Sequence, residues 1–184
     1  NKQLPSQSKN IIIDCTANEF IAKQYSKFFK MGFSIIAANK NANTLSQSYY
    51  DQLKKDRNNY HVNFKYETNV GAGLPMVSTI KSLYESGDEI ISFKGILSGT
   101  LSYLFKIYDG KKFFADILME AHKKGYTEPD PRMDLNGIDV GKKILILLRE
   151  NGVKCEINDI EIENLIPNSI NPNISIQDFF YELK

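Results

Sequence analysis

The feature that most constrains the fold is a pair of short apolar segments on either side of a helical pattern. Ile11 to Thr16 is mostly apolar and is typical of a strand buried on both faces of a parallel sheet. Glu19 to Met31 predicts a helix, because large apolar side chains recur there at helical spacing and Gly32 ends the pattern. Phe33 to Ala37 predicts a second buried strand. Strand, helix and strand in this order form a βαβ unit, whose crossover is expected to be right-handed.

The alternation continues for one more repeat. Thr44 to Arg57 predicts a helix, and Val62 to Glu67 predicts a third strand. Because strands that alternate with helices are typical of doubly wound α/β proteins, we expect the opening stretch to form half of such a domain.

After Thr68 the alternation stops. Pro75 suits the first position of a helix that extends to Ser86, and the alternating residues Glu89 to Ile96 predict a strand. The other predicted elements are helices at 98–108, 114–124, 138–149 and 175–183, a strand at 161–166, and an irregular stretch at 126–136 that contains two prolines. This mixture predicts an α+β domain that follows the first domain.

Composition excludes several classes of partner. The 23 basic and 22 acidic side chains leave a formal charge of +1, which gives no reason to expect binding to nucleic acid or to a membrane surface. No apolar run reaches the ~18 residues of a membrane span, and residues 1–10 lack the core of a signal peptide. Cys15 and Cys155 match no metal spacing, and we expect Cys15 to be buried. A cytoplasmic location follows from these features.

Four segments occur in an order that narrows the function. They are Ala38-Asn39-Lys40, Asn69-Val-Gly-Ala-Gly-Leu-Pro75, Gly95-Ile-Leu-Ser-Gly-Thr-Leu-Ser-Tyr103, and Gly125-Tyr-Thr-Glu-Pro-Asp-Pro-Arg132 leading to Asp139 and Lys143. Together they resemble homoserine dehydrogenases, and the second segment is most similar to bifunctional aspartokinase–homoserine dehydrogenases. The resemblance implies an NAD(P)-dependent oxidoreductase of threonine and methionine biosynthesis that interconverts L-homoserine and L-aspartate 4-semialdehyde.

The resemblance also implies that the chain is the middle of a longer protein. The family begins with a strand, a Gly-x-Gly-x-x-Gly turn and a helix that holds the pyrophosphate, and no such motif occurs here. We expect residues 1–68 to be the C-terminal half of a Rossmann-like dinucleotide-binding domain. Residues 69–184 are expected to be part of an α+β substrate and dimerisation domain. Met133 departs from the family, which usually has aspartate at this position.

Lys143 is the residue that we expect to exchange a proton with the substrate. It follows Asp139 by four residues, so the two side chains share one face of a helix. The alternative is an exposed ion pair worth about 0.3–0.5 kcal/mol. Ile144 to Leu148 is apolar all round, however, which is typical of a buried helix and predicts partial desolvation of Lys143. The resemblance assigns catalysis to Lys143 and makes Asp139 its orienting partner and a substrate ligand.

Glu128 lies in a stretch that Pro129 and Pro131 hold in place. Such a carboxylate could belong to a turn or a helix cap. The resemblance makes Glu128 the ligand of the substrate amino group. It assigns further substrate contacts to Tyr126, Asp134, Gly99 and Thr100.

Thr16 ends the first predicted strand and Lys40 follows the second, at the carboxyl ends where ligands of open α/β sheets bind. A lysine at such a position can also be a solvated surface charge. The resemblance places Lys40 in the active site between substrate and cofactor, and Thr16 beside the cofactor, NADP or NAD.

The loop that contains Gly71 and Gly73 has two interpretations. The glycines can serve only to permit a sharp reversal of the chain. In enzymes that the chain resembles, oxygen atoms of this loop hold a monovalent cation, usually sodium. The positions that match are Glu67, Val70, Ala72 and Leu74.

Two rival interpretations stay open at this point. A dehydrogenase of another small hydroxy or amino acid would use the same fold, and an inactive remnant or dimerisation module would agree with the missing glycine motif. The resemblance further implies a homo-oligomer, with the 89–96 strand in a shared sheet, and an aspartokinase fused upstream.

Overall fold

The computed structural model describes residues 10–184, which form two compact units. The first unit contains the described residues up to Ile91 together with Lys142–Asp159, and the second contains Ser92–Gly141 together with Ile160–Lys184. The return of residues 142–159 to the first unit is a feature of packing that the sequence did not reveal. The domain boundary after residue 68 concerns the natural protein and stays a prediction.

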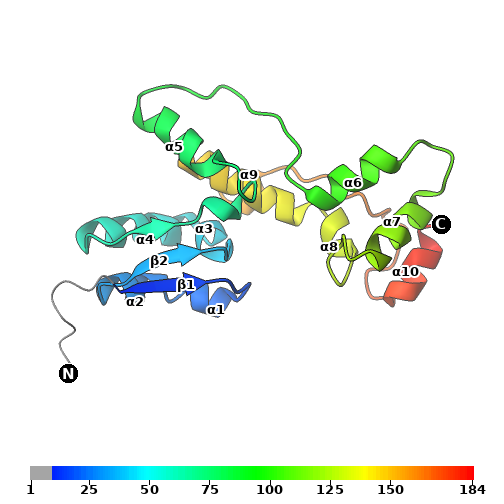
Figure 1. Cartoon of the computed structure of the whole chain (residues 1–184), viewed down its shortest axis with the longest axis horizontal. Helices are drawn as coiled ribbons and strands as arrows, with labels where there is room; N and C mark the ends of the chain where they lie inside the picture. Colours follow the sequence, from blue (N-terminus) through cyan, green and yellow to red (C-terminus); the bar gives the residue numbers. More distant parts are fainter. Residues whose placement is uncertain (1–9) are drawn as a thin grey trace. The chain divides into compact units, whose positions relative to one another are not determined.

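A parallel sheet forms the centre of the first unit (Figure 1). Its strands are β1 (Ile11–Asp14), β2 (Ser34–Ala37) and β3 (Phe64–Lys65), in the order β1-β2-β3. Both neighbouring pairs are parallel. The predicted βαβ unit and its repeat are therefore confirmed.

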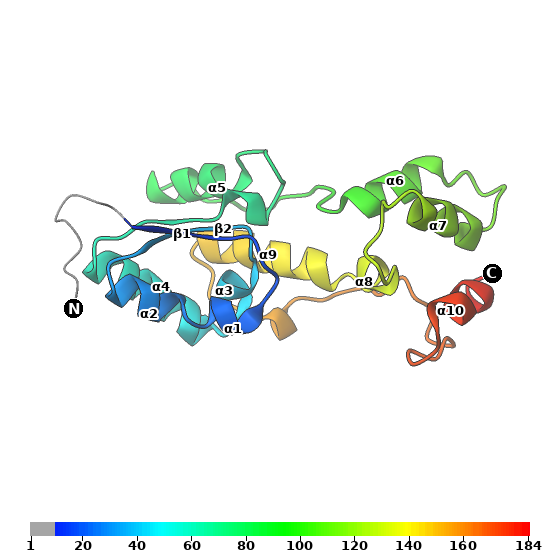
Figure 2. The same ribbon diagram turned by 60° about the horizontal axis from the view of Figure 1, so that its bottom comes forward.

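Helices connect the strands and lie on one face of this sheet (Figure 2). Between β1 and β2 are α1 (Glu19–Ala22) and α2 (Tyr25–Lys30), and between β2 and β3 are α3 (Asn41–Thr44) and α4 (Gln47–Asn59), with α4 packed against α2. Each crossover was predicted as one helix and is two. The Tyr49 hydroxyl donates to the Ala22 carbonyl at 2.6 Å. Ala22 is the last residue of α1, so this hydrogen bond lies where the first predicted helix is interrupted.

The core of the first unit lies between the sheet and these helices. Its fully buried members are Ala22, Tyr25, Phe29, Ile35, Ala37, Ala42 and Leu53. The prediction that the first strand is buried on both faces is wrong in this structure, because Ile11 and Ile13 are 55% and 68% exposed. Cys15 is exposed rather than buried, since the strand ends one residue before it.

The first unit is completed by three further elements and part of a long helix. These are a 3₁₀ turn at Glu67–Asn69, α5 (Met76–Glu85), a 3₁₀ turn at Ile157–Asp159, and the C-terminal part of α9 (Ile138–Glu150). The predicted helices at 75–86 and 138–149 are thus confirmed.

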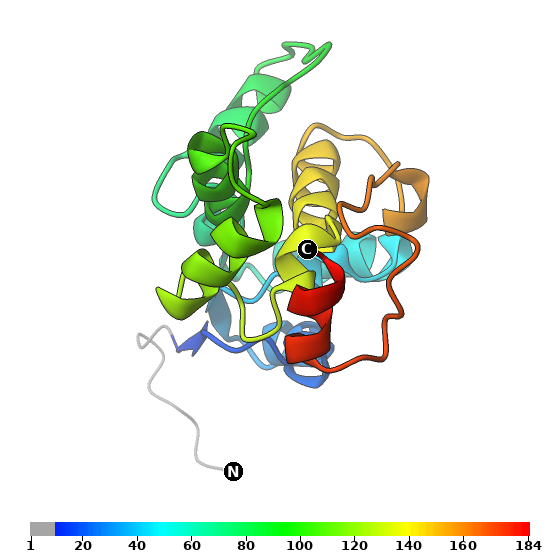
Figure 3. The ribbon, with the colours of Figure 1, turned by 90° about the vertical axis from the view of Figure 1, so that its right-hand side faces the viewer.

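The second unit is helical among the residues that the structure describes. It contains α6 (Gly99–Ile107), α7 (Phe114–Lys123), α8 (Arg132–Leu135) and α10 (Ile176–Glu182), with α6 and α7 side by side (Figure 3). A shared core holds them together: Leu104, Ile117, Leu118, Ala121, Leu135, Ile170, Phe179 and Phe180. The stretch 126–136, predicted to be irregular, contains the short helix α8.

Two predicted strands, at 89–96 and at 161–166, are absent among residues 10–184. A strand requires pairing with a neighbouring strand, and neither segment has such pairing among residues 10–184. Ile91 and Ile96, which the alternation placed in the first of these strands, are 93% and 75% exposed. None of the helices among residues 10–184 has the length and apolar character needed to cross a membrane.

Candidate active site

A buried carboxylate organises the carboxyl end of β1. Asp14 is 3% exposed, and one of its oxygens accepts from the Thr16 backbone N–H at 2.8 Å and from Thr16 Oγ1 at 2.7 Å. The other oxygen accepts from the Tyr25 hydroxyl at 2.5 Å and from Asn39 Nδ2 at 3.0 Å. Since a carboxylate has about four acceptor positions, this set fills all of them. Asp14 therefore positions its neighbours and has no acceptor position left for a ligand.

The same network fixes the charge of Asp14. Burial works to raise the pKa of Asp14, but the hydrogen bonds from Tyr25, Thr16 and Asn39 outweigh burial and hold the pKa below its usual 3.8. Burial and the neighbouring carboxylate raise the pKa of Tyr25, so its hydroxyl stays protonated as a donor.

The structure places Thr16 and Lys40 where the sequence predicted. Thr16 follows β1, is exposed, and accepts from the Asn18 N–H at 3.1 Å. Lys40 is half-buried after β2, and its carbonyl accepts from Thr44 Oγ1 at 3.2 Å. Asn39 joins the two strand ends, because its Nδ2 donates to the Asn18 carbonyl as well as to Asp14.

Glu67 stabilises the start of α5. Its carboxylate accepts from the Val77 N–H at 2.9 Å and from the Ser78 N–H at 3.1 Å. These backbone groups belong to the first turn of the helix, which otherwise leaves them without partners. The Leu74 carbonyl accepts from the Met76 N–H at 2.8 Å, and Ala72 has a φ of 53°, in the left-handed region.

The other predicted cation positions lie in the same loop. Val70 is fully buried and Leu74 is 63% exposed. Among residues 10–184, no group of three or more His, Cys, Asp and Glu side chains could hold a metal ion. The proposed site consists mainly of backbone carbonyls, which are not among these side chains, so the cation stays a prediction.

Lys143 lies on the part of α9 that belongs to the first unit. It is half-buried, and Leu145, Ile146 and Leu147 after it are fully buried, as the apolar run predicted. The adjacent Lys142 donates to Asn41 Oδ1 at 3.4 Å. Asp139 lies on the same helix, four residues before Lys143, in the part assigned to the second unit.

The end of α9 carries two buried charged residues that sequence analysis missed. Arg149 is 1% exposed and Glu150 is 3% exposed. Arg149 donates to the carbonyls of Asn43 and Leu45, each at 2.8 Å, and to the Cys155 carbonyl at 2.9 Å. The first two bonds attach α9 to the end of α3, and the third attaches it to the segment that follows α9.

The second unit brings the predicted substrate contacts together. Thr100 Oγ1 donates to the Tyr126 carbonyl at 2.7 Å, which ties the start of α6 to the proline-containing loop. Two residues further on, the Glu128 N–H donates to Asp134 Oδ2 at 2.8 Å. The Glu128 side chain is exposed, while Asp134 is half-buried on α8. Gly99 is the first residue of α6, which Ser98 caps through the Leu101 N–H at 3.1 Å.

The predicted residues thus fall into two groups, each held by its own hydrogen bonds. The first unit carries Thr16, Lys40, Lys143 and the loop of Glu67, and the second carries Gly99, Thr100, Tyr126, Glu128, Asp134 and Asp139. Asp14 and Asn39 were not predicted, although a carboxylate that ends an apolar strand is a recognisable signal. Glu150 offers no such signal, because its partners are distant in the sequence.

A parallel sheet with polar residues at its carboxyl edge defines a class of protein, the doubly wound α/β proteins that bind nucleotides at this edge. The family model described as "Homoserine dehydrogenase, NAD binding domain" matches residues 2–67, and the model described as "Homoserine dehydrogenase" matches residues 75–182. The chain belongs to the homoserine dehydrogenase family. The predicted family and fold class are confirmed.

Individual proteins agree with this assignment. A bifunctional aspartokinase/homoserine dehydrogenase of Buchnera aphidicola is 42% identical over 177 residues, which are 96% of this chain and 22% of that protein. A crystal structure of a protein of unknown function from Candida auris has a TM-score of 0.91 at 33% identity and covers 97% of this chain and 51% of that one. A hyperthermophilic archaeal homoserine dehydrogenase in complex with NADPH has a TM-score of 0.69 at 26% identity, over 79% of this chain and 44% of that one. The chain therefore spans only part of the proteins that it matches.

Proposed function

We propose that this chain supplies the substrate-binding and proton-transfer residues of an NAD(P)-dependent homoserine dehydrogenase. The reaction interconverts L-homoserine and L-aspartate 4-semialdehyde, a step towards threonine and methionine. The observation that carries the proposal is Lys143, a half-buried lysine two residues before the fully buried Leu145 on α9, with Asp139 one turn before it. The family membership supports the same chemistry.

Lys143 acts as the acid and base in this scheme. When homoserine is oxidised, its hydroxyl proton passes to the Lys143 amine, and when the aldehyde is reduced, the ammonium returns a proton to the oxygen. In the second direction the positive charge of Lys143 also stabilises the negative charge that develops on that oxygen. Asp139 orients the lysine, and Lys40 contributes a second cation.

The substrate is an amino acid, so its charged groups require fixed partners. The Glu128 carboxylate binds the substrate ammonium, and the hydrogen bond from Glu128 N–H to Asp134 holds the loop that presents it. Gly99, Thr100 and Tyr126 complete the substrate contacts, and the bond from Thr100 to the Tyr126 carbonyl keeps this loop against α6.

The nicotinamide of NADP or NAD exchanges the hydride when it is bound. The residues present fit that end of a dinucleotide, because Thr16 and Lys40 follow adjacent parallel strands and the saturated Asp14 holds Thr16 in place. An archaeal family member binds NADPH, which supports NADP as the cofactor. Oxygen atoms of Glu67, Val70, Ala72 and Leu74 are the proposed ligands of a sodium ion.

Further partners follow from the relatives. The name of the Buchnera protein combines aspartokinase with homoserine dehydrogenase, which supports an upstream aspartokinase in the natural polypeptide. We also infer a homo-oligomer in which the exposed 89–96 segment gains a strand partner from a second copy. The cytoplasm is the proposed location.

Lys143→Ala in the full natural polypeptide tests the proposal, with Lys142→Ala as the matched control on the same helix. Loss of the acid and base is expected to lower kcat with homoserine by about 10²- to 10⁴-fold. The dissociation constant of the cofactor, measured by calorimetry, should change little in either variant. Normal turnover by Lys143→Ala would refute the role of this lysine. A wild-type protein that oxidises another hydroxy acid in preference to homoserine would refute the substrate.

A further inference from the structure

Glu150 is a buried carboxylate with a defined set of partners. One of its oxygens, Oε1, accepts from the Tyr50 hydroxyl and from the Tyr66 hydroxyl, each at 2.6 Å. Tyr50 lies on α4 and Tyr66 directly follows β3. One carboxylate oxygen therefore joins α9 both to a helix and to the end of a strand. All three residues are at most 8% exposed. Burial raises the pKa of both tyrosines, which keeps their hydroxyls protonated as donors.

Burying the Glu150 carboxylate is not an efficient way to increase the free energy of unfolding. A buried charged group loses its hydration, and apolar residues of similar volume stabilise a core at least as well in many proteins. A buried polar network does, however, allow only one arrangement of its members, because any shift leaves a donor or acceptor unpaired. Glu150 therefore fixes where α9 lies against α4 and β3.

Lys143 is on the same helix and in the same compact unit as Glu150. Seven residues separate them, which is two helical turns, or about 10 Å along the axis, and returns to the same face. Leu145, Ile146 and Leu147 between them are fully buried, so this part of the helix moves as a packed whole. A displacement at Glu150 is therefore passed to the Lys143 backbone.

We propose that Glu150 is a positioning residue for Lys143: the hydroxyls of Tyr50 and Tyr66 hold the Glu150 carboxylate, and this contact sets the position from which Lys143 exchanges its proton. The inference rests on the proposed role of Lys143. It assigns no contact with substrate to Glu150 itself.

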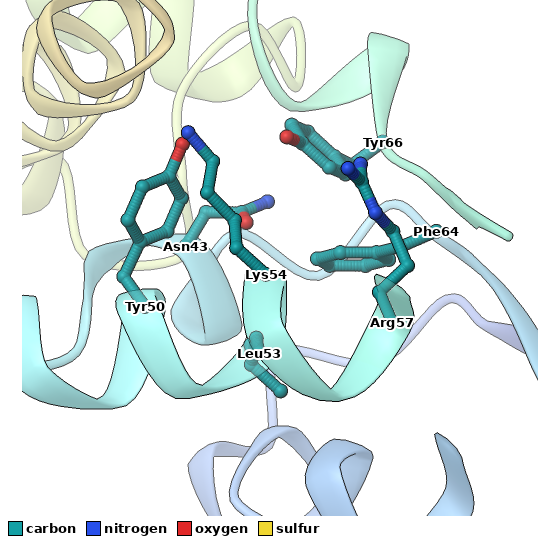
Figure 4. A pocket seen from close by; sticks show the side chains of 7 residues that line it. All are labelled: Asn43, Tyr50, Leu53, Lys54, Arg57, Phe64 and Tyr66. Atoms are coloured by element: carbon teal, nitrogen blue, oxygen red, sulfur yellow. The ribbon is translucent and has the colours of Figure 1, made fainter. Parts of the chain in front are cut away.

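A hollow beside this network offers a way to test it. It is lined by Asn43, Tyr50, Leu53, Lys54, Arg57, Phe64 and Tyr66, and so includes both tyrosines that bind Glu150 (Figure 4). Asn43 Oδ1 is buried there without a hydrogen-bond partner among the described residues. If Glu150 is shortened to alanine, formate can occupy the space that the Glu150 carboxylate leaves beside the two hydroxyls.

The experiment uses the full natural polypeptide and compares kcat, the homoserine KM, the cofactor dissociation constant and the melting temperature. Glu150→Ala is expected to lower kcat by about a hundredfold, the usual effect of misplacing a reacting group by about 1 Å. The homoserine KM and the cofactor dissociation constant should change by less than about threefold, since groups that only bind are untouched. Added formate should restore part of kcat. Glu150→Gln, which keeps an acceptor oxygen, should retain most of the wild-type kcat.

Tyr49→Phe is the matched control. Tyr49 is the neighbour of Tyr50 on α4 and donates a hydrogen bond of the same 2.6 Å length, but to the Ala22 carbonyl rather than to α9. Its loss should lower the melting temperature about as much as Tyr50→Phe while kcat is retained. If Glu150→Ala does not fold, the double variant Tyr50→Phe/Tyr66→Phe keeps the packing volume, removes both donors, and is expected to lower kcat in the same way.

Two results would overturn the inference. One is a folded Glu150→Ala, or the double tyrosine variant, with wild-type kcat. The other is a loss of kcat in Tyr49→Phe as large as in Tyr50→Phe, which would indicate that kcat follows the overall stability of the first unit. A wild-type protein without activity on homoserine would instead remove the proposed function, and this inference with it.

Discussion

Replacing Arg149 with methionine removes the guanidinium that joins α9 to two other backbone segments. Its nitrogens reach the carbonyls of Asn43, Leu45 and Cys155 at 2.8–2.9 Å and the Glu156 carboxylate at 3.1 Å. Methionine fills much of the volume but donates no hydrogen bond, so the buried carbonyls lose their partners. Breaking one side of a buried charged network costs about 3–5 kcal/mol. At about 2–4 °C per kcal/mol for a chain of this size, the melting temperature should fall by about 6–20 °C.

Arg57→Met is the control for this measurement. Arg57 is half-buried, and among residues 10–184 the hydrogen bonds of its side chain go only to the neighbouring Asn58 side chain, at 3.1 and 3.3 Å. Its replacement should cost no more than about 1 kcal/mol, as for other exposed polar pairs. Urea unfolding followed by circular dichroism at pH 7 gives both values. If Arg149→Met is within about 1 kcal/mol of Arg57→Met, Arg149 is not the tie between these segments.

Three further predictions concern the strand ends and the second unit. Glu128→Gln should raise the homoserine KM by at least about tenfold, because a charged partner of the substrate ammonium is lost, and an unchanged KM would remove Glu128 from the site. Folding lowers the pKa of Asp14, so its contribution to stability is complete above its unfolded pKa near 3.8 and is lost as pH falls through the folded value. The difference in unfolding free energy between wild type and Asp14→Asn, measured with urea, should therefore shrink as pH falls below about 4. A constant difference would contradict the hydrogen-bond network around Asp14. Ser98→Ala should destabilise α6 by about 1 kcal/mol through the lost bond to the Leu101 N–H, whereas Ser102→Ala, inside the same helix, should not.

The elements with strong local patterns were predictable from the sequence. The alternation of Ile11–Thr16, Glu19–Met31 and Phe33–Ala37 predicted parallel strands, and the structure has them. The apolar run after Lys143 predicted a buried helix for a related reason, because a helix that is apolar on every side belongs in a core.

The failures concern features that depend on distant residues. Tyr50 and Glu150 are 100 positions apart, and no periodic pattern connects them. The Glu89–Ile96 segment has the alternation of a strand but no partner among the described residues, and alternation alone does not supply one. Where the predicted Glu19–Met31 helix is split, the Ala22 carbonyl accepts a hydrogen bond from the hydroxyl of Tyr49, which lies in the next crossover.

The residues of the candidate site could be predicted from the sequence, because they belong to motifs. The buried residues that hold them in place could not. Lys143, Asp139 and Glu128 belong to motifs, whereas Asp14 and Glu150 support other residues from within the core. Such supporting residues have no motif of their own, because a buried carboxylate is recognised only when its donors are seen around it.

Transfer of deuterium from homoserine labelled at C4 tests the central claim most directly. The full natural polypeptide is mixed with the labelled substrate and oxidised cofactor, and mass spectrometry follows the label. The account predicts that deuterium moves from the substrate to the nicotinamide in the wild-type protein and in Lys142→Ala, and that transfer is lost in Lys143→Ala. Absence of label on the nicotinamide in the wild type, or equal transfer in Lys143→Ala, would contradict it.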